Sequence, residues 1–270
     1  MAIESTHEIS VRERTVVKRF RHGCGAEATR EWRALSLLHE HAPGLAPRPI
    51  GASLDEQQPE IVMSRVPGQS LTGHVTSNQL DAIALALDRM HYAPPAAAYS
   101  GFERTFPPET FPAQIQKLAA ACPEDTADPL TRHALQEVLA WLTTGDWAAR
   151  LAESDQYQVF GQGDGNLANF LWDGTNVRVV DFEDSGPSSR AQALADFTEH
   201  LTVWAHGGID ADDFLNRFDL SPAERDEVLN LRRIMAAAWL IMLLPGGRAS
   251  QRNPAGTEQR AAGRLLDLLT

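Results

Sequence analysis

A change of pattern at Pro67-Gly68 most constrains the fold of this 270-residue chain. Before it, short runs with apolar residues at alternate positions predict strands at residues 7–20, 48–53 and 60–66, and helical spacing predicts one helix at 26–41. Beyond it, helical periodicity dominates and prolines separate the segments. The sequence therefore predicts an α+β fold, with residues 1–66 as a sheet-rich lobe and 67–270 as a larger, mainly helical lobe.

Within the second part, short apolar runs bounded by glycines also predict small strands. A capping Ser221, followed by proline and by a glutamate three residues later, predicts a helix that ends near Leu244. The predicted helices cover residues 78–91, 112–121, 130–153 and 221–244, and the predicted strands cover 157–161, 169–172 and 177–182.

Charge and composition exclude several classes of protein. Residues 1–66 hold 9 Lys and Arg against 9 Asp and Glu, so the rest of the chain holds 15 against 27. This acidic field repels nucleic acid and favours a cationic partner, although a solvated acidic surface explains it equally well. The longest apolar run, residues 234–244, is too short to span a bilayer and predicts a buried helix.

The two cysteines and the N-terminal residues predict the compartment. Cys24 and Cys122 match no metal or redox spacing, so we interpret them as free thiols in a reducing environment. The first residues show no basic start followed by an apolar run, as a secretion signal would. We therefore expect a cytoplasmic protein with no membrane partner; its oligomeric state cannot be derived from the sequence.

The most informative segment begins at Gly161 and contains Asp164, Asn169 five residues later, and Asp181 at the end of an apolar run. Phosphoryl transfer requires a carboxylate that orients the attacking hydroxyl and hard oxygen ligands that hold magnesium against the phosphates. Asp164 suits the first task, and Asn169 and Asp181 suit the second. Asp164 or Asn169 alone is also typical of a glycine-rich turn, but a carboxylate that ends an apolar run, as Asp181 does, needs a partner.

A lysine in the first lobe completes the pattern. Lys18 shares one strand face with Val16 and Phe20, because side chains alternate along a strand. A buried ammonium needs an anionic partner, and Glu31 on the following helix is the first candidate, with Glu27 one turn earlier. The alternative is a surface lysine whose stem covers Val16.

These residues carry a resemblance to a known family. The strings GQGDGNLANFLWDG, VVDFEDSG and ALADF resemble the aminoglycoside phosphotransferase and choline kinase-like branch of the protein-kinase-like fold. Further similarity lies in the Val-Val-Lys run ending at Lys18, in residues 30–35, in residues 61–68 and in residues 87–91. The resemblance therefore spans most of the chain in the expected order.

The resemblance implies a small-molecule kinase that transfers the γ-phosphate of ATP or GTP to a hydroxyl group. It implies that Asp164 is the catalytic carboxylate, that Asn169 and Asp181 bind Mg²⁺, and that Lys18 paired with Glu31 contacts the nucleotide phosphates. It further implies that the backbone of Ser64 and Val66 receives the edge of the base, and that Asp196 braces the catalytic loop. An aminoglycoside-type antibiotic, an amino alcohol such as choline and a sugar all remain open as the small-molecule acceptor.

The chain departs from the family pattern in three places. Gln162 replaces the histidine before Gly-Asp, and residues 188–190 replace a Gly-Asp-Pro turn. No glycine precedes Gly23, so we expect the glycine-containing hairpin over the phosphates to be absent or much shortened. That departure motivates an alternative of another class, a nucleotide-binding protein without catalysis.

Several other polar residues have two interpretations. Glu199, His200 and His206 could line an acceptor pocket with Trp204, but helix packing is the more frequent situation for such residues. An acidic cluster at residues 210–213 could attract an amine, or it could begin a helix. Glu183 and Asp184 lie close enough to Asp181 to tune a metal site, an interpretation with no more support than a solvated surface. These last two groups therefore stay open.

Overall fold

The computed structural model describes residues 7–120, 128–153, 158–247 and 249–270. The chain divides into two compact units. The first comprises residues 1–105 and 158–188, and the second comprises 106–157 and 189–270. The predicted lobe boundary after residue 66 is a different division of the chain, and it stays a prediction.

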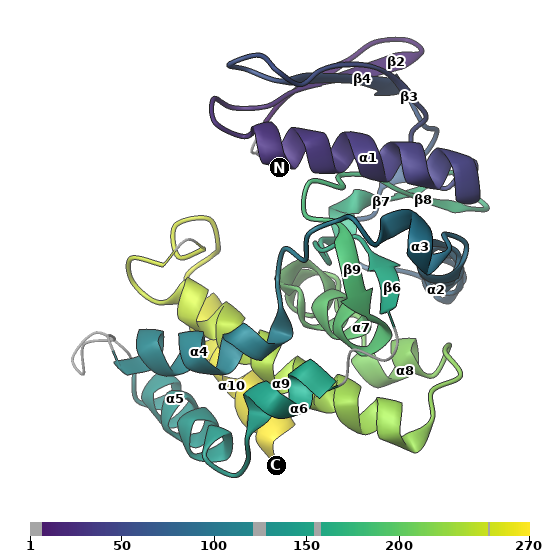
Figure 1. Cartoon of the computed structure of the whole chain (residues 1–270). Coiled ribbons are helices and arrows are strands. Elements are labelled where there is room, and N and C mark those ends of the chain that lie inside the picture. The colour runs from purple at the N-terminus through teal and green to yellow at the C-terminus, as the bar shows by residue number, and fades with distance from the viewer. Residues whose placement is uncertain (1–6, 121–127, 154–157, 248) are drawn as a thin grey trace. The chain divides into compact units, whose positions relative to one another are not determined.

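The first unit begins with an antiparallel sheet and a long helix (Figure 1). The strands are β1 (Glu8–Val11), β2 (Thr15–Arg19), β3 (Pro49–Ser53) and β4 (Glu60–Ser64), in the order β1-β2-β4-β3. Helix α1 (Gly25–His41) runs along this sheet and buries Leu35 and Leu38. The predicted small sheet with one helix is therefore confirmed.

The remaining elements of the first unit carry the loops that matter below. They are β5 (Gln69–Ser70), α2 (Ser77–Tyr92), α3 (Ala96–Tyr99), β6 (Gln158–Gly161), the 3₁₀ turn η3 (Leu167–Asn169), β7 (Phe170–Trp172), β8 (Val177–Val179) and β9 (Gly186–Ser189). Strands β5, β7 and β8 form one sheet, and β6 pairs with β9. Gly68 precedes β5 with φ 116°, and a Cβ there would lie 2.9 Å from the carbonyl carbon of Trp172. Only glycine fits this approach of β5 to β7.

The second unit is helical. Its elements are η1 (Pro108–Thr110), α4 (Phe111–Ala120), α5 (Pro129–Leu142), α6 (Trp147–Glu153), α7 (Arg190–Glu199), the π-helical turn η4 (Thr202–His206), α8 (Ala211–Leu215), α9 (Pro222–Leu243) and α10 (Thr257–Leu269). Helix α9 is central, because α7, α10, α4 and α5 all contact it. Ser221 and Glu224 form the predicted capping box at its start.

Two element predictions were wrong in their extent. The predicted helix over residues 130–153 is two helices, α5 and α6, with a turn at residues 143–146 that contains Gly145. The predicted strand over residues 177–182 ends at Val179, because Asp181 has a left-handed backbone with φ 65° that no strand accommodates. Ala121, Cys122 and Tyr157 lie outside the described residues.

The apolar run of residues 234–244 belongs to α9 and its C-terminal cap, and most of it is buried, as predicted. Within the described part of the chain, no helix combines the length and the hydropathy needed to cross a membrane.

Candidate active site

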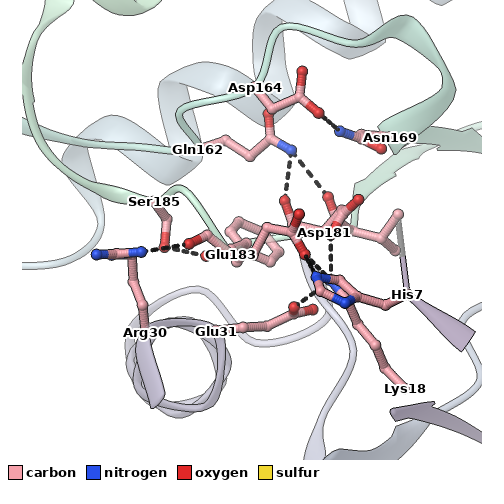
Figure 2. A network of polar contacts seen from close by, with 12 residues as sticks. His7, Lys18, Arg30, Glu31, Gln162, Asp164, Asn169, Asp181, Glu183 and Ser185 are labelled. Carbon is pink, nitrogen blue, oxygen red and sulfur yellow. Dashed lines mark hydrogen bonds and ion pairs between the residues drawn. The ribbon is translucent and has the colours of Figure 1, made fainter. Parts of the chain in front are cut away.

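The ammonium of Lys18 is the centre of a cluster of carboxylates in the first unit (Figure 2). Its Nζ lies 2.6 Å from Glu31 Oε2, 2.5 Å from Asp181 Oδ1 and 2.7 Å from Glu183 Oε2. The strand register contributes to its burial, because Lys18 pairs with Ile61, which is fully buried. The predicted ion pair with Glu31 is therefore confirmed, and the surface interpretation of Lys18 was wrong.

This cluster holds more negative than positive charge, and the pKa values reflect it. Burial alone would lower the pKa of Lys18, but Glu31, Asp181 and Glu183 outweigh it and hold that pKa above its ordinary range. Burial raises the pKa of Glu31. The Lys18 ammonium offsets only part of this rise, because Asp181 and Glu183 share the same ammonium and their charges raise the pKa of Glu31 further. Lys18 thus stays charged.

A histidine that the sequence interpretation missed extends the cluster. His7 lies just before β1 with its ring packed on Phe20, at 4.5 Å between centroids, and its Nε2 is 3.0 Å from Glu183 Oε2. Burial lowers the pKa of His7 despite the opposing charge of Glu183. The hairpin register could have indicated its position, because extending the pair Glu8–Arg19 by one step places His7 opposite Phe20.

The segment after β6 holds two more of the predicted site residues, Asp164 and Asn169. Asn169 Nδ2 donates to Asp164 Oδ2 at 2.9 Å, and the backbone N–H of Asn166 donates to Asp164 Oδ1 at 3.1 Å. Asn166 caps the 3₁₀ turn that carries Asn169, so local structure positions the Asn169 side chain beside Asp164. Burial, reinforced by the charge of Asp181, raises the pKa of Asp164 to about 6.

Gln162 braces the loop that carries Asp181. Its side-chain amide is buried and donates to the backbone carbonyls of Val180, at 3.1 Å, and of Asp181, at 2.8 Å. These bonds hold the left-handed backbone of Asp181, a conformation that a residue other than glycine adopts rarely. The glutamine that stands in place of the family histidine therefore supports the loop by hydrogen bonding.

The two loops also approach each other through backbone. Gly163 has φ 82°, and a Cβ there would lie 2.2 Å from the carbonyl oxygen of Asp184. Any larger residue would separate the segments that carry Asp164 and Asp181. Burial raises the pKa of Asp184 to about 6, with the charges of Glu183 and Asp164 adding to the effect.

The predicted base-binding residues lie at the end of β4. The N–H of Ser64 donates to the carbonyl of Arg48, at 2.9 Å, and its hydroxyl accepts from the N–H of Arg48. Of its backbone groups, Ser64 can therefore offer only its carbonyl to a base. Val66 follows two residues later, outside the strand.

The donor set fits magnesium. Glu31, Asp181 and Glu183 could by proximity hold a metal ion, but the Lys18 ammonium already lies among them. Asp181 is the most exposed of the three, at 39% of its side chain, and Asn169 is fixed through its nitrogen, which leaves its amide oxygen for another contact. One carboxylate and one amide oxygen are the hard ligands that Mg²⁺ prefers.

In the second unit, Glu199 belongs to a buried ion cluster. Its Oε1 lies 2.6 Å from Arg232 Nε and 2.8 Å from Arg264 Nη2, and its side chain is 0% exposed. Packing is thus the correct interpretation of Glu199. His200 is also buried and contacts Trp239, while His206 is exposed.

The acidic cluster at residues 210–213 begins α8, because Asp210 accepts a hydrogen bond from the N–H of Asp213. Helix capping therefore explains at least this carboxylate. Asp196 lies on α7, and its bracing role stays a prediction.

Comparisons with known proteins identify the class. The profile of the phosphotransferase enzyme family matches residues 5–228, so the chain belongs to this family. No curated protein matches the sequence.

Solved structures agree in fold. Choline kinase LicA from Streptococcus pneumoniae matches with a TM-score of 0.62 at 15% identity, over 100% of this chain and 91% of that one. The GDP complex of aminoglycoside 2'-phosphotransferase-IIIa matches with a TM-score of 0.65 at 13% identity, over 100% of this chain and 89% of that one. Spectinomycin phosphotransferase APH(9)-Ia, in complex with ADP and spectinomycin, matches with a TM-score of 0.61 at 11% identity, over 98% of this chain and 86% of that one. The predicted protein-kinase-like fold is therefore confirmed.

Proposed function

We propose that this phosphotransferase is a small-molecule kinase that moves the γ-phosphate of ATP or GTP to a hydroxyl of a small acceptor. One observation carries the proposal. Asp181 contacts the Lys18 ammonium directly, and Asp164, paired with Asn169, lies close enough to Asp181 for their charges to interact. A cation for phosphates, ligands for a metal and a carboxylate for a hydroxyl thus occur in one compact unit.

Each group has a proposed role. Asp164 accepts the hydrogen bond of the acceptor hydroxyl and aligns it, and its raised pKa is closer to neutrality than that of an ordinary aspartate. Asn169 and Asp181 hold Mg²⁺, which neutralises phosphate charge when bound. Lys18, oriented by Glu31, contacts the nucleotide phosphates. Catalysis then comes from positioning and from charge stabilisation.

The base has a proposed location on the sheet. The Ser64 carbonyl and the Val66 N–H would receive its polar edge. Val11 is 60% exposed and pairs with Val16 on the sheet face that carries Lys18. Exposed apolar groups on that face suit the flat surface of a purine.

Nucleotide binding requires an exchange of partners at Lys18. An ammonium has three N–H donors, and Lys18 donates to three carboxylates. One carboxylate must release a donor before a phosphate can accept it. Asp181 is the proposed one, because it is the most exposed and is also the proposed metal ligand.

The acceptor is proposed only by class. An aminoglycoside-type antibiotic fits the acidic excess of residues 67–270, and an amino alcohol such as choline or a sugar is the second candidate. We also propose a cytoplasmic location and no nucleic-acid partner, on the charge and cysteine usage above.

A non-catalytic nucleotide-binding protein is the alternative, because residues 12–14, which connect β1 to β2, contain no glycine. The experiment is a coupled assay of magnesium-dependent nucleotide consumption with a panel of aminoglycosides, amino alcohols and sugars. Acceptor-dependent consumption in the intact protein and none in Asp164→Asn supports the kinase. Tight nucleotide binding without nucleotide consumption for any acceptor supports the alternative. The matched control for Asp164→Asn is Asp55→Asn, at an exposed site.

A further inference from the structure

Contacts with three described residues fix the side chain of His7. Its ring lies against Phe20, its Nδ1 accepts the backbone N–H of Arg21 at 3.2 Å, and its Nε2 meets Glu183 Oε2 at 3.0 Å. Because Nδ1 accepts, the neutral ring carries its proton on Nε2 and donates it to Glu183. The His7 side chain is only 3% exposed, so the ring has little freedom to move.

Glu183 receives His7 and Lys18 on the same oxygen. Its Oε2 lies 2.7 Å from Lys18 Nζ and 3.0 Å from His7 Nε2. Arg30 on α1 fixes the backbone of the same residue, since its Nη1 donates to the Glu183 carbonyl at 2.8 Å. The glutamate is thus held at both ends, by a histidine at its carboxylate and by an arginine at its carbonyl.

This arrangement matters once Asp181 leaves the ammonium. Glu31 and Glu183 then remain as the two carboxylates that direct Lys18 (Figure 2). Glu31 is locked by full burial on α1, whereas the Glu183 side chain is 20% exposed. The more exposed of the two is the one that His7 contacts.

We propose that His7 is a positioning residue for the transfer reaction, which holds the Glu183 carboxylate against Lys18 while the third N–H of Lys18 turns to a nucleotide phosphate. The inference rests on the proposed function, because it assumes that Lys18 contacts the phosphates. The inference adds a residue that lies just before β1, outside the segments that carry Asp164, Asn169 and Asp181.

Two variants separate the hydrogen bond from the packing of the ring. His7→Phe keeps an aromatic ring against Phe20 and removes the donor to Glu183. His7→Gln loses the ring but keeps an N–H at the reach of Nε2. His22→Phe and His22→Gln, at an exposed site fifteen residues along the chain, are the matched controls.

The measurements are titration of each full-length variant with magnesium-ADP and magnesium-ATP, thermal unfolding, and steady-state kinetics with an acceptor that the wild type uses. We expect His7→Phe to weaken nucleotide binding and raise the nucleotide KM by about 10-fold, the effect of losing one hydrogen bond to a charged group. The kcat should change less than about 3-fold, because the lost contact is made equally before and during transfer. His7→Gln should restore most of the affinity.

A double-mutant cycle gives an independent readout. Glu183→Gln should weaken binding, and adding His7→Phe to it should cost far less than His7→Phe alone, because the two act through one contact.

Several results would overturn the inference. One is a nucleotide affinity of His7→Phe equal to that of the wild type, and another is an equal loss of affinity in His7→Phe and His7→Gln. Additive effects in the double-mutant cycle, or an equal loss of affinity in the His22 controls, would also contradict it. If the wild type binds nucleotide and transfers phosphate but His7→Phe matches it, only the role of His7 fails. If the wild type binds no nucleotide, the proposed function and the role of His7 fail together.

Discussion

The two compact units each contain an ion cluster, and the clusters differ in which charge lies at the centre. In the first unit, three carboxylates surround the single ammonium of Lys18. In the second unit, the buried carboxylate of Glu199 lies between the guanidinium groups of Arg232 and Arg264, and Arg232 also reaches the exposed Asp212 at 3.4 Å. Both clusters take charges out of water, which costs free energy that only good partners offset.

The difference indicates what each cluster is for. Glu199 is 0% exposed and its two guanidinium partners donate to both of its oxygens, so it gains nothing by exchanging partners. Asp181 is 39% exposed and shares its cation with two other carboxylates. An excess of negative charge at a partly open position attracts a further cation, whereas a satisfied carboxylate in the core stabilises the fold.

The largest effect that sharpens this comparison is expected at Asp164. Asp164→Asn keeps the shape of the side chain but removes the carboxylate proposed to align the acceptor hydroxyl, so turnover should fall by about 10²- to 10⁴-fold. Titration with magnesium nucleotide should show affinity close to that of the wild type. Turnover equal to that of the Asp55→Asn control would remove Asp164 from its role.

Glu199 should show the opposite behaviour. Glu199→Gln leaves the buried guanidinium of Arg232 and the half-buried one of Arg264 without their shared anion, so the free energy of unfolding should fall by about 3–5 kcal/mol. Urea unfolding measures this, with Asp226→Asn at an exposed site on α9 as the control. Nucleotide affinity of the folded protein should not change. A stable Glu199→Gln protein with altered nucleotide affinity would reverse the assignment of the two clusters.

Asp181 tests the open side of the first cluster. Asp181→Ala removes the proposed metal ligand. Loss of a residue that only supports a metal ligand lowers affinity by roughly 10- to 100-fold, so affinity for magnesium nucleotide should fall here by at least that much. Calorimetry with and without Mg²⁺ measures this, beside Asp55→Ala. If magnesium still strengthened nucleotide binding to the same extent, Asp181 would not be a ligand.

The most gradual expected effect comes from pH in the second unit. Burial, reinforced by His206, lowers the pKa of His200 to about 3, below its ordinary value of 6.5. The unfolded chain therefore binds a proton between these values that the folded protein does not, and the contribution of His200 to stability is complete above pH 6.5 and falls as pH decreases toward 3.

His200→Asn keeps an acceptor near the Thr202 N–H, which donates to Nδ1 at 3.2 Å, and removes the titration. The difference in unfolding free energy between wild type and variant should change by at most about 1.4 kcal/mol per pH unit from pH 7 to 4. Comparing the two proteins cancels the raised pKa values of Asp164 and Asp184, which act in the opposite direction. A constant difference across this range would contradict a buried neutral histidine.

The sequence predicted those parts of the site that follow from local periodicity. Alternation along β2 placed Lys18 among apolar residues and so required an anionic partner, for which Glu31 on the following helix was the first candidate. The contact between Asp164 and Asn169, five residues apart, is also local, because a 3₁₀ turn lies between them and ends at Asn169.

The parts that the sequence did not predict depend on backbone geometry and on distant contacts. The left-handed conformation of Asp181 ended a predicted strand early and aimed its side chain at Lys18, 163 positions away. His7 is an isolated histidine whose partner Glu183 lies far along the chain, and no periodicity joins them. The role of Gln162 depends on two carbonyls exposed by that same turn.

The most direct measurement of the central claim is a crystal structure of the protein with Mg²⁺ and a non-hydrolysable ATP analogue. The account predicts that Lys18 contacts a phosphate while Glu31 and Glu183 stay on the ammonium, and that Asp181 and Asn169 contact the metal. A nucleotide bound away from these residues, or Lys18 still bonded to all three carboxylates beside a bound nucleotide, would contradict it.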